Sequence, residues 1–303
     1  MRGARATLGR VLRVPGGAVG GVLLLIVLLV AFLGPLVTPH SPTEIVGMTS
    51  GPSTPSYPLG TDFLGRDVLS RVLAGGRTVV LIGFISAVVA YVIGGAIGIL
   101  LGLRGGTADF VGMRVVDVLL TVPAILYLLL LASSLGQSDW VLVLGVVIVL
   151  FPPIARVVRT ATLTVSRRGY VEAATARGDG VLTVCRRDIL PNILPNVLAD
   201  FGIRFSVSIL LVAGLNYLGL GLAPPTPDWG LMTSENQSTI TLNMWAVVAP
   251  AAMLAVLSVS INLLSDAYLR TLGSSSVLPR RRRRMKRVTA SMGATQVGSV
   301  ETS

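Results

Sequence analysis

The sequence predicts an all-α membrane protein with about six transmembrane helices. Of its 303 residues, 52% are hydrophobic and only 13% are charged, and the mean hydropathy is +0.78. Soluble domains carry about 25% charged residues, so most of this chain is too apolar to face water. Because apolar stretches recur along most of the chain without a long polar block between them, we expect a single membrane domain.

Six apolar stretches are long enough to cross a hydrocarbon core of about 30 Å. They lie near residues 17–37, 78–103, 115–135, 141–157, 200–222 and 246–265. Four arginines precede the first stretch, so a signal peptide is an alternative there. The stretch is long and has no small-x-small cleavage site before Pro35, and we therefore expect it to be the first span.

The basic residues predict the orientation of the spans. If the N-terminus lies in the cytoplasm, 21 of the 25 Lys and Arg residues fall in cytoplasmic segments, as the positive-inside rule requires. The same rule places both termini in the cytoplasm. The net charge of +11 therefore reflects membrane topology, and we do not expect nucleic-acid binding.

This topology divides the chain into four segments. Residues 1–16 form a basic cytoplasmic N-terminus, and residues 17–77 hold the first span, an outer loop and an amphipathic segment. Residues 78–270 form the transmembrane core, which includes a cytoplasmic loop at 158–198. Residues 271–303 form a basic cytoplasmic tail that we expect to be disordered and that could contact anionic lipid.

One face of the second span is predicted to pack closely against another helix. Ala90, Gly94, Gly98 and Gly102 recur every fourth residue along it. In lipid, apolar side chains gain little by associating, so helices pack through small residues that let their backbones approach.

Four ionisable residues lie within about two turns of the end of an expected span: Asp117, Asp200, Arg204 and Asp266. We interpret them as interfacial side chains that reach towards the headgroups. No expected span then carries an ionisable residue at its middle, which counts against a proton-coupled secondary carrier.

The segment that follows the first span is predicted to be an amphipathic helix on the outer membrane face. Its apolar stripe consists of Leu64, Val68, Leu69, Val72 and Leu73. On its polar side, Asp62 and Arg66 are spaced four residues apart as an ion pair, and so are Asp67 and Arg71. Gly65 belongs to the same motif. We expect the segment to anchor the loop or to contact solute.

The loop between the fourth and fifth spans is predicted to form a helix-turn-helix on the cytoplasmic face. Residues 171–177 suit a short helix, and Gly178 and Gly180 can adopt left-handed conformations that turn the chain. A second helix should then end near Pro191.

This loop resembles the corresponding loop of ABC importer permeases. The shared residues are Glu172, Ala173 and Ala174, Gly178 six positions after the glutamate, and Ile189, Leu190 and Pro191. In that family the short helix docks into a groove on the ATPase subunit, which implies that these residues couple the chain to an ATPase. Arg177 stands where the family tends to have an apolar residue, and Gly180 weakens the second helix by about 1 kcal/mol relative to Ala. Both departures affect the expected strength of docking.

Two further motifs resemble one branch of that family, the C-type permease subunit of dipeptide and oligopeptide importers, which also includes nickel importers. They are the outer segment at 59–71 and the stretch 216–221 with 224–230. Together the resemblances cover most of residues 17–270.

The resemblance implies a permease subunit of an ATP-driven, binding-protein-dependent importer in the bacterial plasma (inner) membrane. The implied partners are a second homologous permease subunit, two ATPase subunits, an extracytoplasmic solute-binding protein and the lipid bilayer. This chain would form half of the translocation path and bind no cofactor, with ATP and Mg on the ATPase subunits. Dipeptides or oligopeptides are the expected solutes, and nickel or another small solute is the alternative.

The residue types that the sequence lacks exclude several other functions. The only lysine, Lys286, lies in an arginine run, so a phosphate-binding Gly-x-x-x-x-Gly-Lys-Ser/Thr loop is absent. His40 and Cys185 are the only residues of their types, so we expect neither a metal site nor a catalytic triad, and no enzyme activity. An ATP-independent carrier or channel and a membrane scaffold are the other classes considered. These motifs do not identify the residues that bind the solute.

Overall fold

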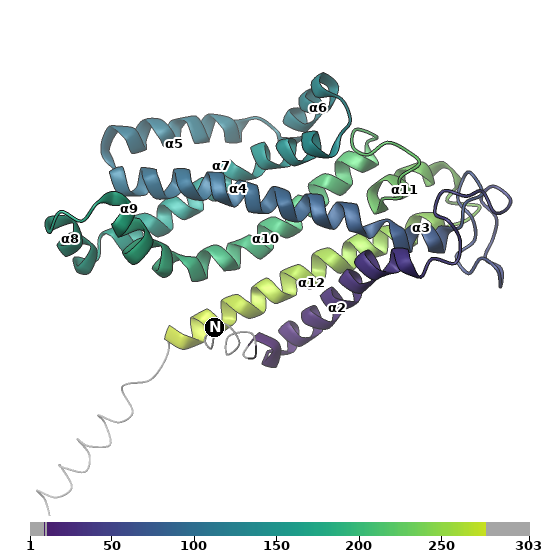
Figure 1. Ribbon diagram of the computed structural model, residues 1–303, viewed down its shortest axis with the longest axis horizontal. Coiled ribbons are helices and arrows are strands. Elements are labelled where there is room, and N and C mark those ends of the chain that lie inside the picture. Colours follow the sequence, from purple (N-terminus) through teal and green to yellow (C-terminus); the bar gives the residue numbers. More distant parts are fainter. Residues whose placement is uncertain (1–8, 10, 277–303) are drawn as a thin grey trace, which may run out of the picture.

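The computed structural model describes residue 9 and residues 11–276, so most of the expected tail and nearly all of the first ten residues lie outside the described part. Within that part every regular element is a helix, and strand-like pairing is limited to two isolated bridges, Ile45–Arg66 and Thr61–Asp67. Figure 1 shows the long helices lying side by side in one elongated bundle. The expected all-α fold is confirmed.

Five helices are long and apolar enough to cross a membrane. They are α2 (Pro15–Leu33, continued by a short 3-10 turn), α4 (Gly76–Arg104), α7 (Asp139–Ser166), α10 (Leu190–Tyr217) and α12 (Trp245–Ser276). A sixth candidate span is the pair α5 (Gly106–Thr121) and α6 (Ala124–Leu135), which is bent by 80°. The chain is therefore a multi-pass membrane protein, in agreement with the expectation of about six spans.

The bend between α5 and α6 corrects the third expected span, which we placed over 115–135 as one helix. Pro123 has no backbone N–H to continue a helix, and it disfavours a helical conformation at the residue before it. Val122 accordingly has φ −81° and ψ 125°, an extended conformation. The candidate span therefore starts earlier, at Gly106, and is broken near its middle.

The second helix of the cytoplasmic loop does not end near Pro191 as expected. Instead, α9 (Val181–Val184) continues through a π-helical turn (Cys185–Ile189) directly into α10. A π-helical turn widens the backbone, which relieves the clash between a following proline ring and the preceding turn of helix. Much of the expected loop 158–198 is thus helical, because α7 and α10 extend into it from both sides.

This continuity moves the start of the fifth span and corrects our interpretation of Asp200 and Arg204. α10 itself runs over Leu190–Tyr217, whereas we expected the span to begin near residue 200. Asp200 and Arg204 therefore lie near the middle of the span, and they are not interfacial side chains at its start.

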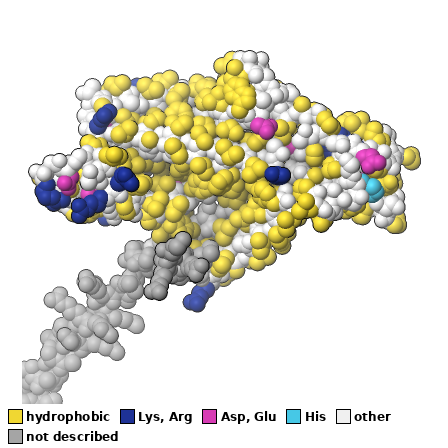
Figure 2. All heavy atoms as spheres, viewed as in Figure 1, with side chains coloured by type: hydrophobic (Ala, Val, Ile, Leu, Met, Phe, Trp, Pro, Cys, Tyr) yellow, Lys and Arg dark blue, Asp and Glu magenta, His cyan; other side chains and the backbone are white. Residues whose placement is uncertain are grey.

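The two ends of the bundle carry different elements (Figure 1). α8 (Gly169–Ala176) and α9 lie at one end, which we call the α8 end; α3 (Val68–Ala74) and α11 (Trp229–Glu235) lie at the other, the α11 end. α2 begins and α12 ends at the α8 end, and the bent pair α5 and α6 runs from the α8 end to the α11 end. Lys and Arg side chains gather at the α8 end in Figure 2.

The backbones of α4 and α7 approach closely along the small-residue face of α4. Ala90 is fully buried, and a Cβ placed on Gly94 or Gly98 would lie 2.6 Å from the carbonyl oxygen of Phe151 or Ala155, respectively. Gly102 is likewise buried, against Thr162. Only glycine permits such contact, so this face fixes the distance between the two helices.

Candidate functional site

The α8 end carries a short projection formed by α8, a turn and α9, residues 169–184, which we call the α8–α9 projection. Its turn is a Schellman motif: Asp179 donates its backbone N–H to the Ala174 carbonyl (3.1 Å), and Gly178 donates to the Thr175 carbonyl (3.0 Å). Gly178 has φ +84°, a left-handed conformation that glycine adopts without strain. Gly180 has φ −63° and ψ 150°, so the left-handed turn that we considered there is absent.

The two faces of α8 differ in exposure. Glu172 and Ala173 are exposed, whereas Val171 and Ala174 belong to the hydrophobic core. Ala174 therefore holds α8 against the rest of the chain. Of the two alanines in the shared motif, only Ala173 is exposed.

The π-helical turn that follows the projection is anchored by a buried side chain. Ile189 is fully buried, while Leu190 is 41% exposed and Pro191 is also exposed. Because Ile189 lies in the π-helical turn, it joins the projection to the first turn of α10. A movement of α8 and α9 would therefore be transmitted to a membrane-spanning helix.

The exposed surface of the projection combines apolar and basic side chains. Tyr170, Val181 and Leu182 are exposed by 44%, 57% and 71%, respectively. The exposed arginines around them are Arg167, Arg168, Arg177, Arg186 and Arg187. Exposed apolar side chains next to many positive charges suit a protein groove with an apolar floor and an acidic rim.

A buried ionic cluster lies at the α11 end, and we define it as Asp62, Arg66, Arg71 and Glu235. Arg66 contacts Asp62 at 2.6 Å and Glu235 at 3.1 Å, and Arg71 contacts the same two carboxylates at 3.0 and 2.8 Å. All four side chains are at most 8% exposed. Two positive and two negative charges balance, which is the condition under which burial of ions is tolerated.

The ionic cluster replaces the amphipathic helix that we expected there. The segment becomes helical only at Val68, and Asp67 caps α3 by accepting hydrogen bonds from Leu69 and Ser70 without pairing with Arg71. Earlier in the segment, the Asp62 carboxylate accepts the backbone N–H groups of Leu64 and Arg66, which stabilises a turn instead of a helix.

Gly65 belongs to that turn, with φ +84°. A Cβ at this position would lie 2.3 Å from the carbonyl oxygen of Gly47. The four residues that we selected in this segment, Asp62, Gly65, Arg66 and Asp67, thus fold one compact loop. These residues hold the fold of the loop, and the loop lies at the opposite end of the bundle from the α8–α9 projection.

Asp228 is a second buried acid at the α11 end, which the sequence analysis did not select. Its side chain caps α11 by accepting hydrogen bonds from Gly230 and Leu231. Burial raises the pKa of Asp228 to about 6, although the Asn216 amide and the two backbone N–H groups favour the charged form. The buried carboxyl group therefore keeps its proton to a higher pH than an exposed aspartate does.

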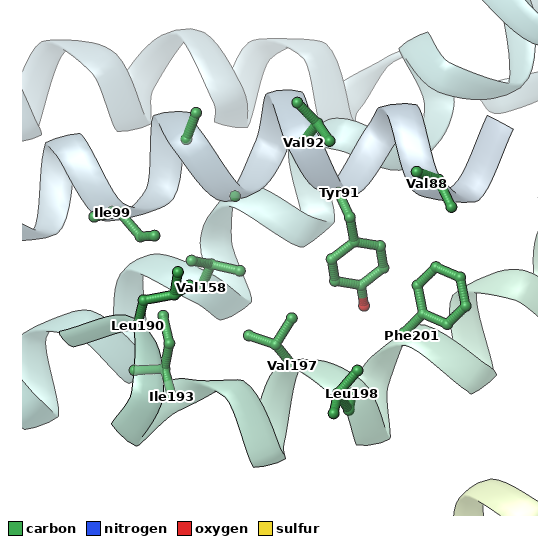
Figure 3. Close-up of a pocket in the computed structure, with 12 residues that line it drawn as sticks. Val88, Tyr91, Val92, Ile99, Val158, Leu190, Ile193, Val197, Leu198 and Phe201 are labelled. Atoms are coloured by element: carbon green, nitrogen blue, oxygen red, sulfur yellow. The ribbon is translucent and has the colours of Figure 1, made fainter. Parts of the chain in front are cut away.

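A pocket of about 370 Å³ opens between α4, α7 and α10 in the middle of the bundle. Figure 3 shows Val88, Tyr91 and Ile99 from α4 facing Val197 and Phe201 from α10. Its volume lies in the lower range for small-molecule sites, about 300–1,000 Å³. No motif predicted this pocket, because its two walls are about a hundred residues apart in the chain.

Tyr91 lines the pocket and binds a charged pair on α10. We call Tyr91, Asp200 and Arg204 the mid-span triad. The Tyr91 hydroxyl donates a 2.5 Å hydrogen bond to Oδ2 of Asp200, and Arg204 Nε lies 3.4 Å from the same oxygen. Groups of His, Cys, Asp and Glu that could hold a metal ion are absent from residues 11–276.

Comparison with known proteins relates most of the chain to membrane transport components. Residues 94–273 match the family described as binding-protein-dependent transport system inner membrane component. The chain is 33% identical over 258 residues to the dipeptide transport system permease protein of Haemophilus influenzae, with 83% of this chain and 88% of the relative covered.

Two other relatives are similar to the chain over comparable lengths. The glutathione transport system permease protein of Pectobacterium atrosepticum is 33% identical over 260 residues, with 85% of this chain and 86% of the relative covered. The di/tripeptide transport system permease protein of Pseudomonas aeruginosa is 34% identical over 258 residues, with coverage of 82% and 85%.

Proposed function

This chain belongs to the family of binding-protein-dependent transport system inner membrane components, and we propose that it is the permease subunit of an ATP-driven importer of short peptides. The similarity to dipeptide, di/tripeptide and glutathione permeases over more than four fifths of the chain carries this proposal. The solutes that those names state are all peptides of two or three residues, so we assign the same class to this chain.

The α8–α9 projection is the proposed contact with the ATPase subunits. It is compact, lies at one end of the bundle and exposes Glu172, Ala173 and Leu182. It is continuous with α10 through the π-helical turn, so closure of an ATPase pair would move a span directly. Such a rigid connection suits alternating access, in which packed helices switch between two arrangements.

The remaining parts of the importer follow from this assignment. The chain has no phosphate-binding loop of its own, so ATP and Mg would be bound by two partner ATPases. A second permease subunit would complete the translocation path, and a solute-binding protein would deliver peptides at the α11 end. The basic α8 end would face the cytoplasm of a bacterial inner membrane.

The correction at Asp200 and Arg204 removes one argument against an ATP-independent carrier, because charged residues do lie near mid-span. The choice between an ATP-driven importer and an ATP-independent carrier therefore depends on family membership. The family is described as a component of binding-protein-dependent transport systems, whereas most secondary carriers work without a binding protein.

Reconstitution tests the proposal directly. The chain, co-expressed with its neighbouring transport subunits and placed in proteoliposomes with the binding protein, should take up Leu-Leu only when ATP is supplied. Uptake of nickel without uptake of Leu-Leu would establish the alternative solute, and Leu-Leu uptake without ATP would establish a carrier.

A pull-down tests the contact with the ATPase. Leu182→Asp should reduce recovery of the ATPase subunits with the tagged chain, since it places a charge in the apolar part of the contact. Met48→Asp is the matched control, because Met48 is 81% exposed at the α11 end. Equal recovery of ATPase from both variants would show that the projection is not the contact.

A further inference from the structure

The mid-span triad occupies a position where charged groups are costly. Asp200 and Arg204 lie near the middle of α10 (Leu190–Tyr217), and Tyr91 lies near the middle of α4 (Gly76–Arg104). The side chains of Asp200 and Arg204 are 18% and 23% exposed. A charged side chain that meets lipid at this depth is strongly disfavoured. The exposed side of the triad must therefore face protein or water in the working assembly.

The triad also keeps unused hydrogen-bonding capacity. Asp200 accepts hydrogen bonds only through Oδ2, from Tyr91 and Arg204, and Arg204 donates only through Nε. Within residues 11–276, Oδ1 of Asp200 and both Nη atoms of Arg204 make no hydrogen bond. A carboxylate oxygen and the two terminal nitrogens of a guanidinium group are thus available to a ligand.

The apolar pocket continues directly from these charged groups. Ile193, Val197, Asp200 and Arg204 follow one another at spacings of four, three and four residues, which places them along one face of α10. Tyr91 joins the two parts, since its ring lines the pocket and its hydroxyl binds Asp200. Phe201 packs against Tyr91 with ring centroids 5.3 Å apart.

We propose that this face of α4 and α10 lines the water-filled translocation path and binds the peptide in transit, a step that rests on the proposed peptide import. Arg204 binds the terminal carboxylate of the peptide. Asp200 accepts a hydrogen bond from the terminal ammonium group of the peptide, and the pocket holds an apolar side chain of the peptide. A zwitterion with an apolar side chain matches both the balanced charges of the pair and the apolar walls beside it.

Thiol labelling tests whether this face is hydrated. Cys185 is the only cysteine, so a Cys185→Ser background allows single cysteines to be placed in the assembled importer. Val197→Cys should react with a membrane-impermeant maleimide in at least one nucleotide state, and saturating Leu-Leu should slow that reaction. Ile203→Cys, on another face of α10, should react slowly with or without peptide.

Peptide uptake tests the role of Arg204. Loss of one hydrogen bond to a charged group costs roughly 10- to 100-fold in binding, so Arg204→Gln should lower the uptake of Leu-Leu relative to its C-terminal amide by about that factor. Arg204→Lys should restore part of the preference. Arg270→Gln, an exposed arginine of α12, should leave the ratio unchanged.

Two results would overturn the inference while leaving peptide import intact. One is a Val197→Cys protein that is as unreactive as Ile203→Cys in both nucleotide states, which would show a dry interface between subunits. The other is an Arg204→Gln importer with the wild-type preference for the free carboxylate. Failure of the wild-type importer to take up Leu-Leu would instead refute the proposed function.

Discussion

Arg71 donates a 2.8 Å hydrogen bond from Nη2 to Oε2 of Glu235, across a separation of 164 residues. Nη1 of the same guanidinium group donates to Asp62 at 3.0 Å. Arg71 therefore joins the loop after α2 to the end of α11 inside the buried ionic cluster. Burial raises the pKa of Glu235, and the charge of Arg66 beside it acts in the opposite direction.

Removal of Arg71 should destabilise the α11 end strongly. Arg71→Met leaves Asp62 and Glu235 with one cation between them, and breaking a buried ion pair typically costs about 3–5 kcal/mol. The measurement is thermal unfolding of the purified protein in mild detergent. Arg77→Met is the control, because Arg77 is exposed at the start of α4. Similar melting temperatures for the two variants would contradict a structural role for the cluster.

The α4–α7 contact predicts opposite effects for the same substitution at two glycines. Replacing a helical glycine with alanine usually stabilises by up to about 1 kcal/mol. Gly214→Ala should follow this rule, since nothing lies within 4 Å of the added Cβ. Gly98→Ala should destabilise, because its Cβ would lie 2.6 Å from the Ala155 carbonyl oxygen. Thermal unfolding distinguishes the two, and stabilisation by both changes would show that α4 and α7 separate easily.

The turn after α8 predicts a defect in coupling without a loss of fold. Gly178→Val forces a β-branched residue into φ +84°, which costs roughly 1–2 kcal/mol. ATP hydrolysis should then proceed with less peptide transported per ATP. Gly178→Asn should retain coupling, since asparagine tolerates the left-handed conformation. Gly169→Val is the control, because Gly169 has open space around it and lies within α8. Equal coupling ratios in Gly178→Val and the control would argue against the turn as a lever.

The features that the sequence predicted well depend on residues close together in the chain. Apolar length predicted the number of spans, the spacing of Gly94 and Gly98 predicted the close face of α4, and Gly178 predicted the turn after α8. Each of these depends on local backbone geometry or on a single helix face. Local patterns of this kind need no knowledge of which elements become neighbours.

The features that the sequence analysis missed depend on contacts between distant segments or on exceptions to local rules. Asp67 and Arg71 have the spacing of a helical ion pair, but they do not pair with each other. Arg71 instead binds the buried Glu235, and Asp67 caps α3. Pro191 normally marks a helix end, and the π-helical turn before it allowed α10 to start earlier. That one exception moved Asp200 and Arg204 from the edge of a span to its middle.

The raised pKa of Asp228 predicts that the fold is more stable in mild acid than at neutral pH. The folded-state pKa is about 6 and the ordinary value is 3.8, so the folded protein binds more protons than the unfolded chain between these values. Stability therefore falls as pH rises through this window and stays lower above it. Between pH 5 and pH 7.5 the expected change is about 1 kcal/mol.

Asp228→Asn isolates this effect. Asparagine can still cap α11, because its side-chain oxygen can accept the hydrogen bonds from Gly230 and Leu231 that Asp228 accepts. It does not titrate, so the difference in melting temperature between pH 5 and pH 7.5 should be smaller than in the wild type. Glu235 shifts in the same direction and is present in both proteins, so the comparison removes its contribution. An unchanged difference in Asp228→Asn would mean that Asp228 is already ionised at pH 5 in the folded protein, with water or a partner group solvating the carboxylate.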